Sequence, residues 1–344
     1  MKVLVLSTLV PFVHGGAEEL YDHLVLNLRR QGIEAEGIRI PFSWNPAEGL
    51  IEEMLVARRL RVSNVDRVIG LKFPAYMIPA ENRVLWLLHQ YRQAYDLLDA
   101  GQSNIPDDAR GREILAAIRA GDALAFSEAR RIYTNAPITG RRLKHYNGFD
   151  SAVLRPPLND PELFPGGESE GYILATGRVN DAKRQTLLVR ALRHVPGLRL
   201  VVAGPPDSAA DAEALRRLAA EEGVEDRVVL DLRFVPRAEL ARMVNGALAV
   251  AYLPFDEDSL GYCTMEAFRA AKPVITTTDS GGVLDIVRDG ENGHVVTPDP
   301  EALAGAMAAL QADAARARRM GLAGREAMEA QRLDWPTTVE RLVS

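Results

Sequence analysis

Short apolar runs alternate with longer segments of helical periodicity along most of this 344-residue chain. Residues 3–7 and 35–40 are apolar runs, and residues 17–31 between them repeat leucine at helical spacing. They predict a strand, a helix and a second strand. The same pattern predicts further strands at 67–71, 84–88 and 131–134, and a helix at 107–121. This βαβ order is typical of a parallel sheet covered by helices.

The alternation stops at residues 155–170, RPPLNDPELFPGGESE, and then restarts. Proline, glycine and acidic residues without periodicity indicate a linker. Beyond it we predict helices to about residue 194 and over 210–222, 238–245 and 300–330. Strands are predicted at 172–176, 198–203, 228–230, 248–253 and 273–278. We therefore expect an α/β protein with two Rossmann-like, doubly wound parallel-sheet domains, residues 1–164 and 165–334.

Composition excludes several classes of protein. A hydrophobic content of 47% in 344 residues supports two ordinary domains rather than one small module. A formal charge of −6 and a pI near 5.7 argue against nucleic acid as a partner. The single cysteine, Cys263, excludes an intramolecular disulfide and fits a reducing compartment. We interpret it as a small buried residue rather than a nucleophile. No apolar run has the length of a membrane span.

The most informative stretch is residues 254–276, PFDEDSLGYCTMEAFRAAKPVIT. A strand ends in an acidic loop, Gly261 opens a helix, and Pro273 ends it before the next strand. Asp258 and Glu266 then lie at the carboxyl end of a parallel strand, where open α/β sheets bind ligands. The first helical amides suit a phosphate, and the two acids would hold neutral hydroxyls. The alternative is a solvated loop and a surface glutamate. The amides concerned belong to Gly261, Tyr262 and Cys263.

Glycine and basic residues follow two other strands. Gly15 and Gly16 lie between the first strand and its helix, where glycine lets backbone amides approach an anion. Arg178 and Lys183 follow the strand at 172–176 and are placed to converge on one anion, the arginine as a fork and the lysine as a point charge. The alternatives are an ordinary tight turn and a solvated basic surface.

Three further features allow more than one interpretation. His89 ends a strand, where it can move a proton, bind a hydroxyl or serve structure alone. The acids at 256–258 could attract a hard cation, but no histidine or cysteine spacing suits zinc, and we expect no metal. Arginine pairs in the first half are interpreted as solvated helix faces, with contact to an anionic membrane as the alternative. These pairs are 29–30, 58–59, 130–131 and 141–142.

Taken together, these features resemble the family 4 glycosyltransferases of the GT-B fold. Those enzymes carry a glycine pair after the first strand, a G-R-x4-K segment early in the second domain, and an E-x7-E motif. A proline-valine strand and a second glycine pair follow the motif. The matching residues here are Gly15-Gly16, Gly177-Arg178 to Lys183, Asp258 to Glu266, Pro273-Val274 and Gly281-Gly282. The resemblance covers nearly the whole chain. It implies two domains facing across a cleft, with a final helix at 335–344 packed back on the first.

The resemblance implies a role for each matching residue. Glu266 would bind the ribose of a sugar nucleotide, and Arg178 and Lys183 would hold its diphosphate. His89 matches a histidine near the transferred sugar. Asp258 stands where the family has glutamate, so its side chain reaches the hexose with one methylene fewer. Backbone near Gly16, Gly261 and Tyr262 would complete the phosphate site, and the base would lie beside residues 233–235, which include Phe234 and Val235.

The implied reaction moves a hexose from a UDP- or GDP-sugar to a hydroxyl of a carbohydrate, lipid-linked or small-molecule acceptor, with retention at the anomeric carbon. It would serve polysaccharide, glycolipid or glycoside synthesis. It would need no metal, because Arg178, Lys183 and helix dipoles stabilise the leaving group. The implied location is cytoplasmic, with peripheral contact at the inner face of the membrane in one interpretation. The alternatives are a sugar-nucleotide hydrolase or epimerase of the same fold and a non-catalytic sugar-nucleotide sensor.

Overall fold

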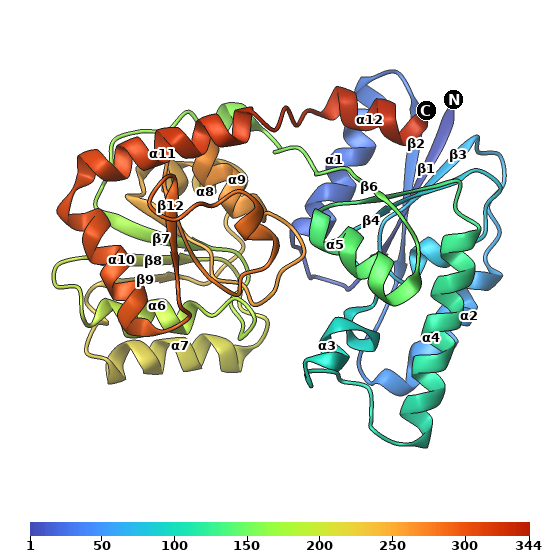
Figure 1. The fold of residues 1–344 in the computed structure, drawn as a ribbon, viewed down its shortest axis with the longest axis horizontal. Coiled ribbons are helices and arrows are strands. Elements are labelled where there is room, and N and C mark those ends of the chain that lie inside the picture. Colours follow the sequence, from blue (N-terminus) through green and yellow to red (C-terminus); the bar gives the residue numbers. More distant parts are fainter. The chain divides into compact units, whose positions relative to one another are not determined.

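Each half of the chain forms a six-stranded parallel sheet in the computed structural model, which describes residues 1–344 (Figure 1). The first sheet has the order β2 (Glu34–Pro41), β1 (Lys2–Leu9), β3 (Arg67–Gly70), β4 (Arg83–Leu87), β5 (Arg131–Thr134) and β6 (Ala152–Val153). The second has the order β12 (Gly293–Val296), β11 (Val274–Thr277), β10 (Ala249–Ala251), β7 (Tyr172–Thr176), β8 (Arg199–Ala203) and β9 (Val228–Asp231). Both match the predicted doubly wound class.

The chain divides into two units, Met1–Pro157 with Leu333–Ser344, and Leu158–Arg332. The boundary thus lies earlier than the 164/165 position expected from composition. Residues 158–164 belong to the second unit because Arg237 anchors them. Its guanidinium donates to the carbonyl oxygen of Asn159 at 2.9 Å and lies 4.8 Å from the ring centroid of Phe164. Proline and glycine content indicated a linker but could not show that its first part is held in place.

The first sheet is covered on both faces. Along β4, Val84 and Trp86 join one apolar cluster, whereas Leu85 and Leu87 join another. This follows from the period-two alternation of side chains in a strand. Helices α1 (Gly16–Arg30) and α12 (Trp335–Val343) contribute to the first cluster, and α2 (Leu50–Arg59) and α4 (Ala109–Ser127) to the second. Two short helices, α3 (Asp96–Asp99) and α5 (Pro137–Arg142), complete the unit.

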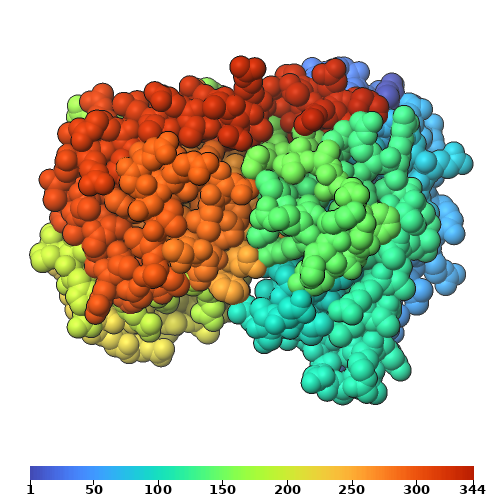
Figure 2. Space-filling view, in the orientation of Figure 1, coloured from blue at the N-terminus to red at the C-terminus, as the bar shows by residue number.

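Helix α12 returns the end of the chain to the first unit. The rings of Trp335 and Trp86 meet edge to face with centroids 6.3 Å apart, and Arg67 donates to the carbonyl oxygen of Leu342 at 3.0 Å. Figure 2 shows the two ends of the chain side by side on the surface, red beside blue. The contact explains why an amphipathic segment far along the sequence belongs to the first core.

The second sheet is also covered on both faces. Figure 1 shows α6 (Gln185–Leu192) and α7 (Ala209–Glu221) on one side, and α8 (Arg237–Gly246) and α9 (Tyr262–Arg269) on the other. Helix α10 (Pro300–Ala312) packs on α6, and α11 (Ala314–Glu329) packs on α9. The predicted elements are present, but β12 was missed. The apolar run after Gly293 that forms this strand is very short.

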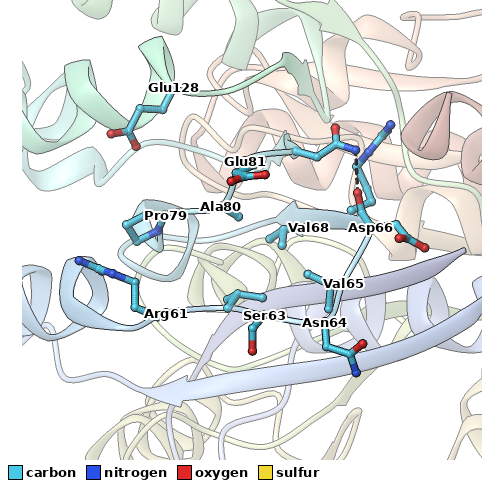
Figure 3. Close-up of a pocket in the computed structure, with 13 residues that line it drawn as sticks. Arg61, Ser63, Asn64, Val65, Asp66, Val68, Pro79, Ala80, Glu81 and Glu128 are labelled. Atoms are coloured by element: carbon cyan, nitrogen blue, oxygen red, sulfur yellow. Dashed lines mark hydrogen bonds between the residues drawn. The ribbon is translucent and has the colours of Figure 1, made fainter.

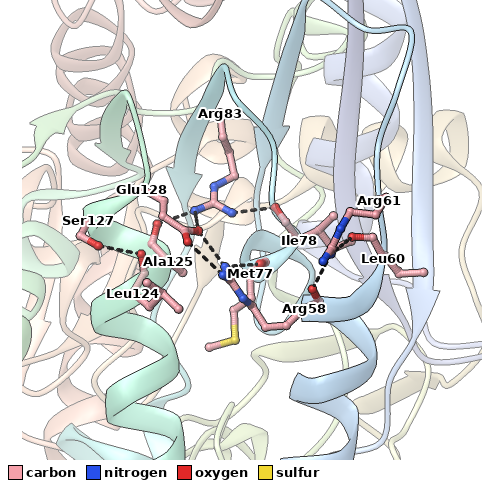
Figure 4. Close-up of polar contacts among 10 residues, drawn as sticks. All are labelled: Arg58, Leu60, Arg61, Met77, Ile78, Arg83, Leu124, Ala125, Ser127 and Glu128. Carbon is pink, nitrogen blue, oxygen red and sulfur yellow. Dashed lines mark hydrogen bonds and ion pairs between the residues drawn. The ribbon is translucent and has the colours of Figure 1, made fainter.

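The amino ends of β3 and β4 hold a polar cluster that joins three elements (Figure 4). Arg83 is fully buried and donates to the carbonyl oxygens of Ile78 and Ala125, both at 2.6 Å, and to Glu128 at 3.2 Å. Arg58 on α2 donates twice to Glu128, at 2.7 and 2.9 Å. Hydrogen bonds from Arg58 hold the pKa of the Glu128 carboxyl below its usual range. The ionised carboxylate therefore ties α2 and α4 to the sheet.

A cavity of about 720 Å³ lies beside this cluster, lined by residues 61–68, 79–82 and Glu128 (Figure 3). Several of its polar groups bond within the unit; Asn82, for example, donates to the carbonyl oxygen of Asp66 at 2.7 Å. Open α/β sheets bind ligands at the carboxyl ends of their strands. Because this cavity lies at the amino ends of β3 and β4, we do not assign it to the candidate site.

None of the helices is long and apolar enough to cross a bilayer.

Candidate functional site

The residues predicted to bind a donor in the second unit follow strands that flank its topological switch point. From β7 the chain runs outward to β8 and β9 on one side, and later to β10, β11 and β12 on the other. Arg178 and Lys183 follow β7, and Asp258 and Glu266 follow β10. Because β7 and β10 are adjacent, two motifs about 80 positions apart in the sequence come to one edge of the sheet.

Arg178 is paired with a carboxylate that the sequence did not single out. Its Nη1 donates to both carboxylate oxygens of Asp207, at 2.9 and 3.1 Å, and Asn180 donates to the same group at 2.8 Å. Asp207 follows β8. The side chain of Arg178 remains 38% exposed, so this pair is partly solvated and exchangeable. An incoming anion would compete with Asp207 for the guanidinium.

Lys183 is likewise engaged by groups from the end of β10. Its ammonium donates to the hydroxyl oxygen of Tyr252 at 3.1 Å and forms a close ion pair with Glu257. Burial, followed by the charge of Glu257, raises the pKa of Tyr252 well above its usual value, so this tyrosine keeps its proton. Because Glu257 lies in the same loop as Asp258, the ion pair shows that Lys183 points toward this loop.

Arg184, the next residue, joins the ends of three strands and was not predicted. Its guanidinium donates to the carbonyl oxygens of Leu253 and Pro254, both at 2.8 Å, and twice to Asp279, again at 2.8 Å. Hydrogen bonds from Arg184 help to keep the pKa of Asp279 low despite burial. The backbone of Arg184 has φ +54°, an uncommon conformation for a residue other than glycine. The cluster holds the Lys183 segment against the acidic loop.

Helix α9 begins at the predicted glycine. Gly261 precedes its first residue with φ +74°, and a Cβ there would overlap the ring of Tyr252, so no other residue fits without a shift. Asp258 and Glu266 are each only 3% exposed. The alternative of a solvated loop and a surface glutamate is therefore wrong. Buried carboxylates require compensating partners.

Glu266 has such a partner in Arg237, the first residue of α8. The same guanidinium reaches Asn159, Phe164 and, at 3.7 Å, the carboxylate of Asp160. Arginine suits such a site because its planar fork can bond and stack at once. No local signal in the sequence identified it, since Arg237 and Glu266 lie 29 positions apart.

The second glycine pair packs directly on the acidic loop. Gly281 has φ +72°, and a Cβ on it would overlap the carbonyl oxygen of Glu257. Gly282 donates its amide hydrogen to that same carbonyl oxygen at 2.7 Å. The pair therefore shapes the loop through close backbone contact. Asn292, whose side chain receives the amide hydrogen of Arg288 at 2.7 Å, is structural.

The remaining predicted donor residues differ in exposure. Phe234 is 62% exposed after β9, whereas Val235 is buried. Cys263 is partly exposed rather than buried as expected, and desolvation of its thiol raises the pKa to about 12, so it is not a thiolate at neutral pH. The structure contains no group of three or more His, Cys, Asp or Glu side chains that could hold a metal ion. The acids at 256–258 do not form such a group either.

The first unit carries Gly15, Gly16 and His89 at the carboxyl ends of its strands. Gly15 caps α1 and Gly16 begins it, after the loop of residues 10–15 that follows β1. The Gly15 amide donates to Glu18 at 3.0 Å, and Glu18 pairs with Lys72 at 3.1 Å. The acidic first turn thus complements the helix dipole.

His89 stands at the end of a buried hydrogen-bonded chain. Its Nδ1 lies 2.6 Å from the carbonyl oxygen of Gln90, so Nδ1 carries the proton and donates. The Gln90 side chain donates to Asn147 at 3.0 Å, Asn147 to the hydroxyl of Tyr95 at 3.0 Å, and Tyr95 to Asp122 at 2.8 Å. Burial raises the pKa of Asp122 to about 7. This chain fixes the loop that presents His89.

Several basic groups of the predicted arginine pairs are bonded within the first unit. Arg58 holds Glu128, and buried Arg142 lies 3.3 Å from Asp96. Arg131 donates to the hydroxyl of Tyr133 at 2.9 Å. These three are therefore committed to the fold. Contact with a membrane would depend on exposed members of the pairs such as Arg30 and Arg59.

Comparison with known proteins identifies relatives of this arrangement. Residues 163–327 match the family described as glycosyl transferases group 1. The D-inositol 3-phosphate glycosyltransferase of Nocardia farcinica is 35% identical over 213 residues, which are 59% of this chain and 45% of that protein. The chain spans about half the length of the curated relatives that it matches.

Solved structures extend the likeness to the whole fold. Sucrose-phosphate synthase from Thermosynechococcus elongatus aligns with a TM-score of 0.76 at 17% identity, covering 99% of this chain and 97% of that one. HepE of Anabaena in complex with UDP-glucose aligns with a TM-score of 0.73 at 17% identity, covering 100% and 98%. These likenesses confirm the predicted GT-B fold.

Proposed function

We propose that this protein, whose residues 163–327 belong to the glycosyl transferases group 1 family, is a retaining glycosyltransferase of family 4. It would transfer a hexose from a nucleotide diphosphate sugar, UDP- or GDP-linked, to an acceptor hydroxyl. The observation that carries this proposal lies within the second unit. Arg178 and Lys183 follow β7 while Asp258 and Glu266 follow the adjacent β10, so cations and buried carboxylates share one sheet edge.

These residues suit the parts of such a donor. Arg178 and Lys183 would bind the diphosphate after exchanging Asp207 and Glu257 for phosphate oxygens. Glu266, which is paired with Arg237, would accept hydrogen bonds from the ribose, and Asp258 from the hexose. Phe234 offers an exposed ring beside the expected base position. The electrostatic work would then need no metal ion.

The proposed transfer breaks the bond between the anomeric carbon and the phosphate oxygen and forms one to the acceptor oxygen on the same face. The acceptor proton would pass to the departing phosphate. Arg178 and Lys183 would stabilise the negative charge that develops there. His89, whose Nδ1 donates to the carbonyl oxygen of Gln90, would bind the transferred sugar through Nε2.

The relatives support the substrate class. HepE was solved with UDP-glucose, and the curated relatives are named D-inositol 3-phosphate glycosyltransferases. We propose a carbohydrate, lipid-linked or small-molecule acceptor bound by the first unit, and a cytoplasmic location. Peripheral membrane contact is a further proposal, favoured by Leu55 and Val56, which are 56% and 57% exposed on α2 beside Arg59.

The first experiment is a thermal-shift screen with UDP, GDP, ADP and their common sugars, since a ligand that binds the native state raises its stability. Donor consumption is then measured with a panel of acceptors and in chelator, and the anomeric configuration of the product by NMR. Turnover without acceptor would favour a hydrolase or epimerase. Tight donor binding without turnover across the panel would favour a sensor.

Replacing Lys183 by alanine should lower turnover by about 10² to 10³, because it removes charge stabilisation of the leaving group. Lys144→Ala, an exposed lysine paired with Asp150 in the first unit, is the matched control. Near-normal transfer by Lys183→Ala would contradict the diphosphate assignment.

A further inference from the structure

We infer that Arg237 is a positioning residue that sets the geometry between the ribose and base subsites of the nucleotide. The inference rests on the proposed function, because it takes Glu266 as the ribose ligand. It adds a residue and a role that neither the motifs nor the relatives assign.

The first step concerns the burial of Glu266. Glu266 is 3% exposed and lies on α9, so the ionised form of its side chain requires a compensating charge. Arg237 supplies that charge from a different helix, α8. A carboxylate held in this way stays an acceptor with a fixed orientation, which is what recognition of ribose hydroxyls requires. Losing the arginine would leave the carboxylate free to rotate or to take up a proton.

The second step concerns what holds Arg237 itself. The carbonyl oxygen of Asn159 accepts from its Nη2 at 2.9 Å, the carboxylate of Asp160 lies 3.7 Å from its Nε, and the ring of Phe164 stacks on it at 4.8 Å. Three residues of the 158–164 segment therefore surround one guanidinium. Lysine cannot reproduce this, because a point charge neither stacks as a plane nor bonds along two edges.

The third step places the base. Arg237 begins α8, and it follows the segment that contains exposed Phe234 and buried Val235 with only Pro236 between. The side chain that fixes Glu266 is thus attached to the backbone expected to meet the base. A shift of Arg237 would change the distance between the base segment and the ribose carboxylate. One residue therefore couples two subsites, of which the base subsite lies on the loop after β9 and the ribose subsite on helix α9.

The test compares nucleotides that differ only in the ribose. UDP and GDP, and their 2′,3′-dideoxy forms, are titrated into the full chain, and the discrimination ratio is measured for the nucleotide that binds. For the unmodified protein we expect a ratio of about 10² to 10⁴, since two hydroxyls lose charge-assisted bonds. In Arg237→Lys the ratio should fall below about 3, while affinity for the dideoxy form stays within about twofold.

Several controls make the outcome specific. Arg242→Lys on the same helix should leave the ratio unchanged. Glu266→Gln by itself should also lower the ratio. The Arg237→Lys/Glu266→Gln double variant should have a ratio no lower than that of either single variant, as for residues that act as one unit. Arg237→Gln provides a second variant if Arg237→Lys unfolds below the assay temperature, and circular dichroism confirms folding.

The failures are distinguishable. An unchanged ratio in Arg237→Lys, or an equal loss of affinity for both forms, would overturn the inference and leave the proposed function standing. If the unmodified protein binds no nucleoside diphosphate at all, the proposed function falls and the inference with it.

Discussion

Replacing Glu257 by glutamine should tighten the binding of a nucleoside diphosphate. In the structure Glu257 forms an ion pair with the ammonium of Lys183, the group proposed to hold the diphosphate. A phosphate must displace this carboxylate and then sit beside it. Glutamine keeps the size and one acceptor oxygen of the side chain but removes the negative charge, so it should weaken the competing contact and the repulsion together.

The magnitude follows from the exposure of the pair. The side chains of Lys183 and Glu257 are 21% and 30% exposed, so water screens them in part. A partly solvated pair contributes about 0–1 kcal/mol, and a like charge at about 4 Å adds roughly 1 kcal/mol of repulsion in a water-like medium. Together they amount to about 1–2 kcal/mol, which is roughly a 5- to 30-fold lower Kd.

Isothermal titration calorimetry with UDP and GDP measures this change directly. The corresponding nucleosides, which lack phosphate, should bind equally to both proteins. The gain should shrink as salt rises from about 0.05 to 0.5 M, because screening shortens the reach of exposed charges. Glu213→Gln, a glutamate 71% exposed on α7, is the control. Unchanged or weaker diphosphate binding by Glu257→Gln would refute the reasoning.

Two further predictions concern stability. The pKa of Asp122 rises from 3.8 to about 7 on folding, so the native state keeps a proton that the unfolded chain releases, and stability should fall as pH rises across that interval. Asp122→Asn should flatten this slope in melting curves recorded from pH 4 to 7, and an unaltered slope would contradict the assignment. Gly261→Ala should cost about 1–3 kcal/mol, because it combines φ +74° with a clash on Tyr252. Gly305→Ala, with open space in α10, should be neutral or stabilising in urea unfolding, and equal effects of the two changes would count against the strain argument.

Part of the candidate site was readable from local pattern. The glycine that opens α9 lies where Gly261 was expected, and the strands that precede Arg178 and Asp258 were placed within a residue or two. These features depend on backbone conformation and on apolar periodicity, which neighbouring residues determine. Whether Asp258 and Glu266 were buried or solvated stayed open, because spacing alone does not reveal what packs above a loop.

The sequence by itself determined the two parallel sheets, the order of their strands along the chain, and the motifs at the strand ends, because periodicity and turn chemistry are local. Only the tertiary structure decided which charges meet. Arg178 pairs with Asp207 across 29 positions, Lys183 with Glu257 across 74, and Glu266 with Arg237 across 29. The first two pairs form because adjacent parallel strands bring their carboxyl ends to one edge, whatever the length of chain between them. The third forms because helices α8 and α9 pack against each other. The first part of the linker belongs to the second unit because a guanidinium on a distant helix holds it.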